Sequence, residues 1–246
     1  MQLDHRTIEE NRIRDVYSLR IANDPRYSWF NSGHLYIVQG LERCLLESIA
    51  ECGFSSLEKS RILEIGCGSG HWLREFVKWG ALPENVVGID LLNDRVFEAR
   101  RLCPKGVEVH CGSATELLFS SASFDLVIQC TMFTSILDIN VKKQIAGEMC
   151  RVLKPKGLIL WYDYHVNNPR NPNVRGIKKR EVHELFPNCT IEFRNVTLAP
   201  PVARWLVSYS WLACYLLEKI PWLCTHYLAA IRKDVEACKP FAQQRK

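Results

Sequence analysis

The sequence predicts an α/β protein in which an open, mostly parallel sheet is covered by helices on both faces. Apolar segments of strand length occur at 61–65, 85–90, 107–111, 124–129 and 157–163. Helical segments alternate with them at 71–79, 94–101 and 139–153. Strands that are apolar throughout are typical of parallel sheets, because both of their faces are buried. In addition, RILEIGCGSG at 61–70 takes the first strand directly into three alternating glycines, as at a ligand-binding turn.

Local signals mark the ends of several helices. A helix over 33–52 is predicted from apolar residues at helical spacing, and Gly53 is placed to end it. Asn93 and Asp138 are predicted N-caps, because their side chains can accept hydrogen bonds from free backbone N–H groups at a helix start.

The last third of the chain departs from strict alternation. Its predicted segments are a polar loop at 165–176, a helix near 178–186, a strand at 190–198, an apolar stretch at 201–221 and a strand at 225–232. The two strands fit an antiparallel hairpin at the sheet edge. We predict a single domain over 1–246. Its parts are an N-terminal lid and helix at 1–56, a cofactor-binding core at 57–165, and an acceptor side with edge strands at 166–246.

Composition narrows the class of protein. A formal charge of +5 without a basic stripe argues against a nucleic-acid partner. The eleven cysteines lack the short paired spacings of a zinc site, so we expect no bound metal. Several cysteines fall in apolar strands, so we expect their thiols to be free and the compartment to be reducing. Residues 1–15 lack the apolar region of a secretory signal. We therefore expect a cytoplasmic location.

The glycine segment, Glu64-x-Gly66-x-Gly68-x-Gly70, resembles the first motif of class I S-adenosylmethionine (SAM) dependent methyltransferases. A dinucleotide site needs a glycine where His71 stands, which argues against NAD or FAD. SAM carries an ammonium, a carboxylate and a sulfonium but no pyrophosphate. An acid beside the bare loop can therefore meet its cationic end.

Two later segments strengthen the resemblance. SFDLVIQC at 123–130 is similar to the fourth-strand motif of this family, and EMCRVLKPKG at 148–157 is similar to the helix and turn before the fifth strand. The motifs cover roughly 61–163 in order. The resemblance implies a Rossmann-like, doubly wound sheet of seven strands with an antiparallel last strand, and SAM as the cofactor.

The resemblance also implies cofactor contacts. Asp90 ends the second strand, where an acid can accept both ribose hydroxyl protons; the alternative is that it caps the strand end. Leu91 is placed to lie against adenine or to pack in the core. The family commonly has an acid where Ser113 stands, so that contact is the least secure. The predicted set is Glu64, Gly66, Cys67, Gly68, Gly70, Asp90, Leu91, Ser113, Ala114 and Gln129, with Thr131 as a further polar contact.

Candidate catalytic residues follow the fifth strand. Methyl transfer is an in-line displacement, and a hydroxyl acceptor must also lose a proton. WYDYHVNNPRNPNVRG at 161–176 resembles a subgroup of methyltransferases from bacterial polysaccharide and secondary-metabolite pathways. His165 is the predicted general base, with Asp163 orienting it or acting itself. The alternative is that His165 caps the loop.

Acceptor contacts are predicted in two regions. In the loop, Arg170 and Arg175 could hold an anionic acceptor or pair with acids nearby, and Tyr162 lies beside them in sequence. Near the N-terminus, the aromatic segment with Tyr27 and His34 suits a lid over the cofactor; Tyr17 is a secondary candidate there.

The segment 201–221 is apolar nearly all round, but its charged residues leave too short an uncharged span for a transmembrane helix. We favour a buried wall or a homodimer surface over an interfacial membrane helix. The function that fits best is SAM-dependent methylation of a small molecule, at an oxygen of a sugar or natural-product intermediate. The alternatives are methylation of RNA or protein, and a catalytically silent methyltransferase-like partner subunit.

Overall fold

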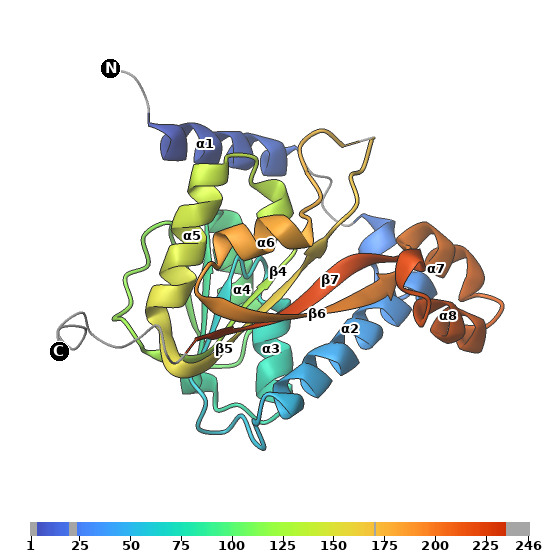
Figure 1. The fold of residues 1–246 in the computed structure, drawn as a ribbon, viewed down its shortest axis with the longest axis horizontal. Helices are drawn as coiled ribbons and strands as arrows, with labels where there is room; N and C mark the ends of the chain where they lie inside the picture. The colour runs from blue at the N-terminus through green and yellow to red at the C-terminus, as the bar shows by residue number, and fades with distance from the viewer. Residues whose placement is uncertain (1–3, 20–23, 170, 235–246) are drawn as a thin grey trace, which may run out of the picture.

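The computed structural model describes residues 4–19, 24–169 and 171–234. Its centre is one seven-stranded sheet in the order β3-β2-β1-β4-β5-β7-β6 (Figure 1). The strands are β1 (Ile62–Ile65), β2 (Val86–Asp90), β3 (Glu108–Cys111), β4 (Phe124–Cys130), β5 (Leu153–Tyr164), β6 (Cys189–Leu198) and β7 (Cys224–Lys233). The first five strands are parallel, whereas β7 pairs antiparallel with both β5 and β6. The predicted seven-stranded sheet with an antiparallel last strand is confirmed.

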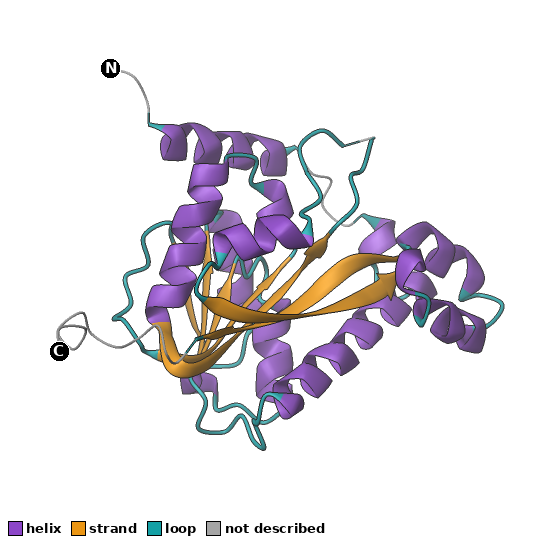
Figure 2. Ribbon diagram, viewed as in Figure 1, coloured by secondary structure: helices purple, strands orange, loops and turns teal. Residues whose placement is uncertain are grey.

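Eight α-helices surround the sheet in the described residues (Figure 2). They are α1 (His5–Ser18), α2 (Ser32–Glu51), α3 (His71–Lys78), α4 (Asn93–Leu102), α5 (Ile139–Val152), α6 (Lys179–Leu185), α7 (Pro200–Leu206) and α8 (Trp211–Glu218). Short 3-10 turns occupy Pro25–Tyr27, Pro83–Asn85, Phe133–Ser135 and Pro221–Leu223.

Two apolar layers bury the two faces of the sheet. On one face, side chains of α5 and α6 such as Ile145 and Leu185 pack against Val127 and Trp161 of the sheet. On the other face, α2, α3 and α4 contribute apolar residues that pack against the alternate residues of the same strands. The predicted helix–strand alternation therefore produces the doubly wound arrangement that it indicated.

Of the two predicted helix N-caps, one is confirmed and one is wrong. Asp138 accepts hydrogen bonds from Asn140 N and Val141 N and is the N-cap of α5. Asn93, by contrast, is the first residue of α4, and Leu92 occupies the cap position. The backbone N–H of Leu92 donates to Asp90 Oδ1 at 2.9 Å, and no side chain caps the start of α4.

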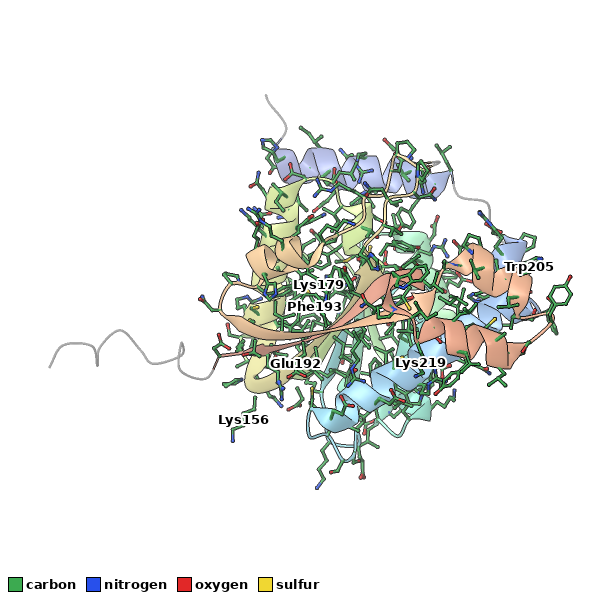
Figure 3. The ribbon with its side chains drawn as sticks, turned by 45° about the vertical axis from the view of Figure 1, so that its right-hand side comes forward. Lys156, Lys179, Glu192, Phe193, Trp205 and Lys219 are labelled. Carbon is green, nitrogen blue, oxygen red and sulfur yellow. The ribbon has the colours of Figure 1, made fainter. Side chains whose placement is uncertain are left out.

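The segment 201–221 forms two short helices, α7 and α8, instead of one long one. Ala203, Val207 and Cys214 are buried against Tyr36 of α2 and Leu198 of β6. One side of this helical pair is therefore a buried wall, one of the two roles that the sequence favours for this segment. The other side exposes several aromatic side chains; Trp205 projects outward from α7 (Figure 3). Among the described residues, none of the helices is long and apolar enough to span a bilayer.

Candidate functional site

A cavity of about 510 Å³ opens at the carboxyl ends of the parallel strands, next to the point between β1 and β4 where the strand order reverses. Ligands bind at this place in open α/β sheets, because helix and loop starts expose free backbone N–H groups there. Predicted site residues that line the cavity are Tyr17, Tyr27, His34, Glu64, Gly66, Cys67, Gly68, Asp90, Leu91, Ser113, Ala114, Thr131 and Tyr162.

The three glycines of the loop have left-handed backbones, with φ of 70° at Gly66, 51° at Gly68 and 74° at Gly70. A Cβ at Gly66 would lie 2.9 Å from Met132 Cγ, and one at Gly70 would lie 2.7 Å from Cys103 Sγ. These two glycines allow the loop to pack tightly, and Gly70 does not line the cavity. Gly68 has no neighbour within 4 Å of its Cβ position, so it leaves open space for a ligand.

Glu64 places a carboxyl group in the cavity wall without a full set of partners. It is buried, and its Oε2 has no hydrogen-bond partner among the described residues. Burial, together with the nearby charge of Asp90, raises the pKa of Glu64 well above its usual range. A cationic ligand group at this oxygen would satisfy it and favour its charged form. The ammonium of SAM has that chemistry, so the residue present fits the cofactor.

Asp90 supports the loop and faces the cavity. Its Oδ2 accepts a hydrogen bond from Gly68 N at 2.8 Å, and its Oδ1 accepts one from Leu92 N at 2.9 Å. Burial raises the pKa of Asp90, while these two donors oppose that rise. Each carboxylate oxygen has a second lone pair, so both can still accept a hydrogen bond from a vicinal diol such as a ribose.

The end of the cavity beyond Asp90 is less polar. Leu91 and Ala114 line it. The hydroxyl of Ser113 lies 2.7 Å from Thr115 Oγ1 and accepts a hydrogen bond from Thr115 N. Ser113 is therefore engaged within its own turn. Leu91 and Ala114 fit the flat apolar face of an adenine.

Helix α1 lies over the cavity and contributes Ile13 and Tyr17 to its lining. Polar contacts hold it there. Arg14 Nη1 donates to Leu91 O at 2.9 Å, and the hydroxyl groups of Tyr17 and Ser135 are 3.0 Å apart. Because α1 bridges the loops after β2 and β4, it shields the cavity from water.

The other half of the cavity is lined by β5, β7 and helices α2, α3 and α7. Tyr162 and His226 stack with ring centroids 4.7 Å apart, and Tyr164 lies 4.4 Å from His226. His34 and Arg204 complete this wall from α2 and α7. This half offers aromatic surfaces, neutral imidazoles and one guanidinium to a second molecule.

Thr131, at the end of β4 in the cavity wall, has φ of 58°. A β-branched residue in this region is strained, and such strain is concentrated at functional sites. We expect Thr131→Gly to be more stable than Thr131→Ala by about 1 kcal/mol, because only glycine is relaxed at this φ. Urea unfolding of the two variants measures the difference. If Thr131→Ala were the more stable variant, as alanine usually is relative to glycine, the result would show that the strain is absent.

His226 supplies a pH test of the cavity wall. Burial lowers its pKa to about 3, so the unfolded chain binds the extra proton between about pH 6.5 and 3. Stability should consequently fall as pH drops through this window, by up to about 1.4 kcal/mol per pH unit. Urea unfolding from pH 7.5 to 5 should show a shallower fall for His226→Gln than for the wild type. If the free energy of unfolding fell with pH equally steeply in both proteins, the result would contradict the burial of a neutral imidazole at His226.

Some predicted site residues lie away from the cavity lining. His165 Nε2 is 3.0 Å from Cys224 O, and its ring stacks on Tyr227 at 4.1 Å. Gln129 is buried and bonds Tyr162 O and Met132 N. Arg170 lies outside the described residues. These positions do not support His165 as the base or Gln129 as a cofactor contact.

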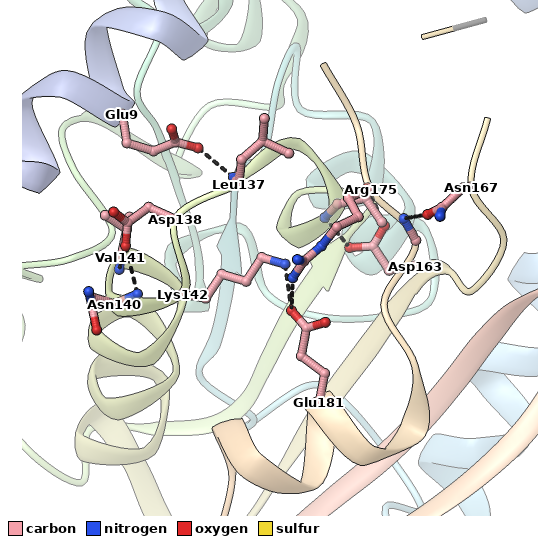
Figure 4. A network of polar contacts seen from close by, with 12 residues as sticks. Glu9, Leu137, Asp138, Asn140, Val141, Lys142, Asp163, Asn167, Arg175 and Glu181 are labelled. Atoms are coloured by element: carbon pink, nitrogen blue, oxygen red, sulfur yellow. Dashed lines mark hydrogen bonds and ion pairs between the residues drawn. The ribbon is translucent and has the colours of Figure 1, made fainter. Parts of the chain in front are cut away.

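Asp163 and Arg175 belong to a polar network behind β5, in which Asp163 is buried and Arg175 is exposed (Figure 4). Asp163 accepts hydrogen bonds from Thr134 N and Thr134 Oγ1, and burial raises its pKa to about 7. Arg175 Nη2 donates to Glu181 Oε1 at 2.9 Å, and Lys142 Nζ donates to the same oxygen at 2.7 Å. This network fixes the polar loop to α5 and α6, and it does not line the cavity.

The cavity residues that were not predicted as site residues include His71, Arg204 and His226. The signal for Arg204 is a basic residue inside an otherwise apolar stretch, and that for His226 is a polar residue inside a predicted strand. His71 follows the glycine loop directly.

Comparison with known proteins agrees with this geometry. Residues 62–157 match the family described as "Methyltransferase domain". The chain is 33% identical over 133 residues to 24-methylenesterol C-methyltransferase 2 of Oryza sativa subsp. japonica, covering 48% of this chain and 35% of that protein. The chain spans less than half the length of the curated relatives that it matches.

Solved structures share the fold. The PH0226 protein from Pyrococcus horikoshii OT3 superposes with a TM-score of 0.61 at 20% identity, over 89% of this chain and 99% of that one. An S-adenosylmethionine dependent methyltransferase from Mesorhizobium loti superposes with a TM-score of 0.54 at 17% identity, over 76% of this chain and 96% of that one. Residues 62–157 therefore match the methyltransferase-domain family, and most of the chain shares its fold with these solved structures.

Proposed function

We propose that the protein is a SAM-dependent methyltransferase that methylates a small molecule, at an oxygen atom of a sugar or natural-product intermediate. The observation that carries this proposal is a single cavity with two chemically different halves. One half has the buried carboxyl of Glu64, the glycine loop and Asp90. The other half has Tyr162, His226 and neighbouring polar groups, where an acceptor can lie beside the donor.

Each half has a defined task in this proposal. SAM, when bound, supplies a methyl group on a sulfonium centre. Glu64 binds the cationic methionine end, and Asp90 accepts both ribose hydroxyls. Helix α1 and the aromatic wall exclude water and align the acceptor, which is the main source of rate in an in-line displacement.

His226 has a positioning role in this scheme. Because burial lowers its pKa to about 3, the imidazole is neutral at physiological pH. A neutral imidazole can accept a hydrogen bond from an acceptor hydroxyl and orient it. It is a weak base, since efficient general bases have a pKa near the working pH. The reaction therefore depends on alignment more than on proton abstraction. As the new C–O bond forms and S-adenosylhomocysteine leaves, the hydroxyl proton becomes acidic enough to pass to the imidazole of His226.

A small acceptor fits the covered cavity better than RNA or protein does, since α1 and α2 both line it. The free thiols among the described cysteines fit a reducing compartment, and a cytoplasmic location is part of the proposal.

The test uses methyl-labelled SAM with purified protein and an extract of the source cells, separated into small-molecule, lipid, carbohydrate, nucleic-acid and protein fractions. We expect label in a small-molecule fraction, and none with Asp90→Ala. Label in nucleic acid or protein would overturn the choice of acceptor. Absence of label despite SAM binding would favour a catalytically silent partner subunit.

A further inference from the structure

Three buried polar atoms without a partner in the described residues belong to cavity-lining side chains. They are Glu64 Oε2, His71 Nε2 and Arg204 Nε. Buried polar groups in proteins are almost always hydrogen-bonded, so each of these atoms points to a missing ligand group. The role proposed for Glu64 accounts for the first. Arg204 is the one of the three that carries a permanent positive charge.

The backbone of Arg204 is held firmly in the wall. Helix α7 packs across the start of α2, where a Cβ at Gly33 would lie 2.7 Å from Arg204 Cα and 2.6 Å from Arg204 Cγ. The absent side chain of Gly33 thus allows this close approach. Ala203, the preceding residue, is fully buried against Tyr36 and Leu198 and anchors the helix. The guanidinium is therefore presented to the cavity from a fixed base.

No acid of the described residues forms an ion pair with Arg204. Asp24 is near enough for its carboxylate to be influenced by the charge of Arg204. Its oxygens, however, are taken up by Arg26, with contacts of 2.6 to 3.0 Å from Nε and Nη2. Glu10, which also lines the cavity, is bonded by Arg6 Nε at 3.0 Å. Arg204 is therefore a partly buried guanidinium without an ion-pair partner among the described residues, which favours binding of an anion from outside the chain.

The neighbours of Arg204 suit the same ligand. His34 is half-buried, and both burial and the charge of Arg204 lower its pKa, so it stays neutral. Its ring lies 5.9 Å from that of Tyr27. A neutral imidazole and a phenol can donate hydrogen bonds to an anion without competing with it for the guanidinium.

We propose that Arg204 binds an anionic group, a carboxylate or a phosphate, on the methyl acceptor. This proposal rests on the function proposed above and makes it more specific. Guanidinium is the side chain best suited to both anions, because its N–H groups match two oxygens at once. The acceptor is then an acid or a phosphate ester whose anionic end lies at α7 while its reacting atom lies toward Tyr162 and His226.

The experiment measures binding of simple anions to protein saturated with S-adenosylhomocysteine (SAH), the product form of the cofactor. The probes are benzoate and phenyl phosphate, with benzamide as the neutral counterpart. Wild type is compared with Arg204→Gln and with Lys219→Gln, which removes an exposed charge just after α8. We expect Arg204→Gln to bind at least one anionic probe tenfold more weakly, with SAH affinity unchanged, and Lys219→Gln to match the wild type.

Three results would overturn the proposal. The first is equal binding of both anions by Arg204→Gln and wild type, and the second is no anion binding by wild type. The third is a tenfold loss of SAH affinity in Arg204→Gln, which would assign the guanidinium to the carboxylate of the cofactor itself. Failure of the proposed function has a different signature, because wild type would then not bind SAH. The probe titration without SAH would still test Arg204.

Discussion

Replacement of Asp90 by alanine is expected to weaken binding of SAM and SAH at least about a hundredfold. The change removes an acceptor for two ribose hydroxyls, and two charge-assisted hydrogen bonds are together worth about 3 kcal/mol. It also leaves Gly68 N and Leu92 N without the carboxylate that now accepts from them at 2.8 and 2.9 Å. Calorimetric titration with SAH measures the effect.

Asp94→Ala is the matched control. Asp94 is exposed in the first turn of α4, four residues further on, and it does not line the cavity. It should bind SAH within about twofold of wild type, because an exposed charge contributes little. Asp90→Asn keeps one acceptor oxygen, so its affinity for SAH should lie between those of Asp90→Ala and Asp94→Ala. An Asp90→Ala affinity within threefold of wild type would contradict the role given to this carboxylate.

Glu181→Ala is expected to lower the free energy of unfolding by about 3 to 4 kcal/mol, because it removes the partner of a buried charge. The side chain of Lys142 is fully buried, and its Nζ is 2.7 Å from Glu181 Oε1. Burial lowers the pKa of Lys142, while Glu181 opposes that shift. Arg175 shares the same carboxylate oxygen at 2.9 Å. Urea unfolding provides the measurement.

Two further variants separate charge from packing. Glu184→Ala, on the exposed side of α6, removes an acid that pairs with the exposed Arg180 and should change stability by less than about 0.5 kcal/mol. The double variant Lys142→Met/Glu181→Leu should recover most of the loss, since an apolar pair leaves no buried unpaired charge, and Arg175, the other partner of Glu181, is exposed to water. A Glu181→Ala protein as stable as Glu184→Ala would contradict the network in Figure 4.

The parallel core could be predicted from the sequence because its signals are local. Continuous apolar strands, the glycine loop and the Asp138 cap are each encoded within a few residues, and all are found in the structure. Helix α1 gave no such signal. Its residues are mostly polar, and it is held by contacts such as Arg14 with Leu91 O, which come from loops far away in the sequence.

Alternation along β5 explains why the acceptor side was harder to predict. Side chains of a strand point to opposite faces in turn. Tyr162 and Tyr164 line the cavity, whereas Asp163 and His165 do not. His226 faces the cavity because β7 lies between β5 and β6, an arrangement that depends on long-range pairing. The sequence indicated the right strand end, but tertiary pairing decided which residues face the ligand.

Calorimetric titration of the wild-type protein with SAH, and in parallel with NADH, tests the central claim most directly. The cavity formed by Glu64, the glycine loop and Asp90 should bind one SAH per chain with micromolar affinity and should not bind NADH. Binding of NADH, or no heat of binding with SAH, would contradict the assignment of this cavity to SAM.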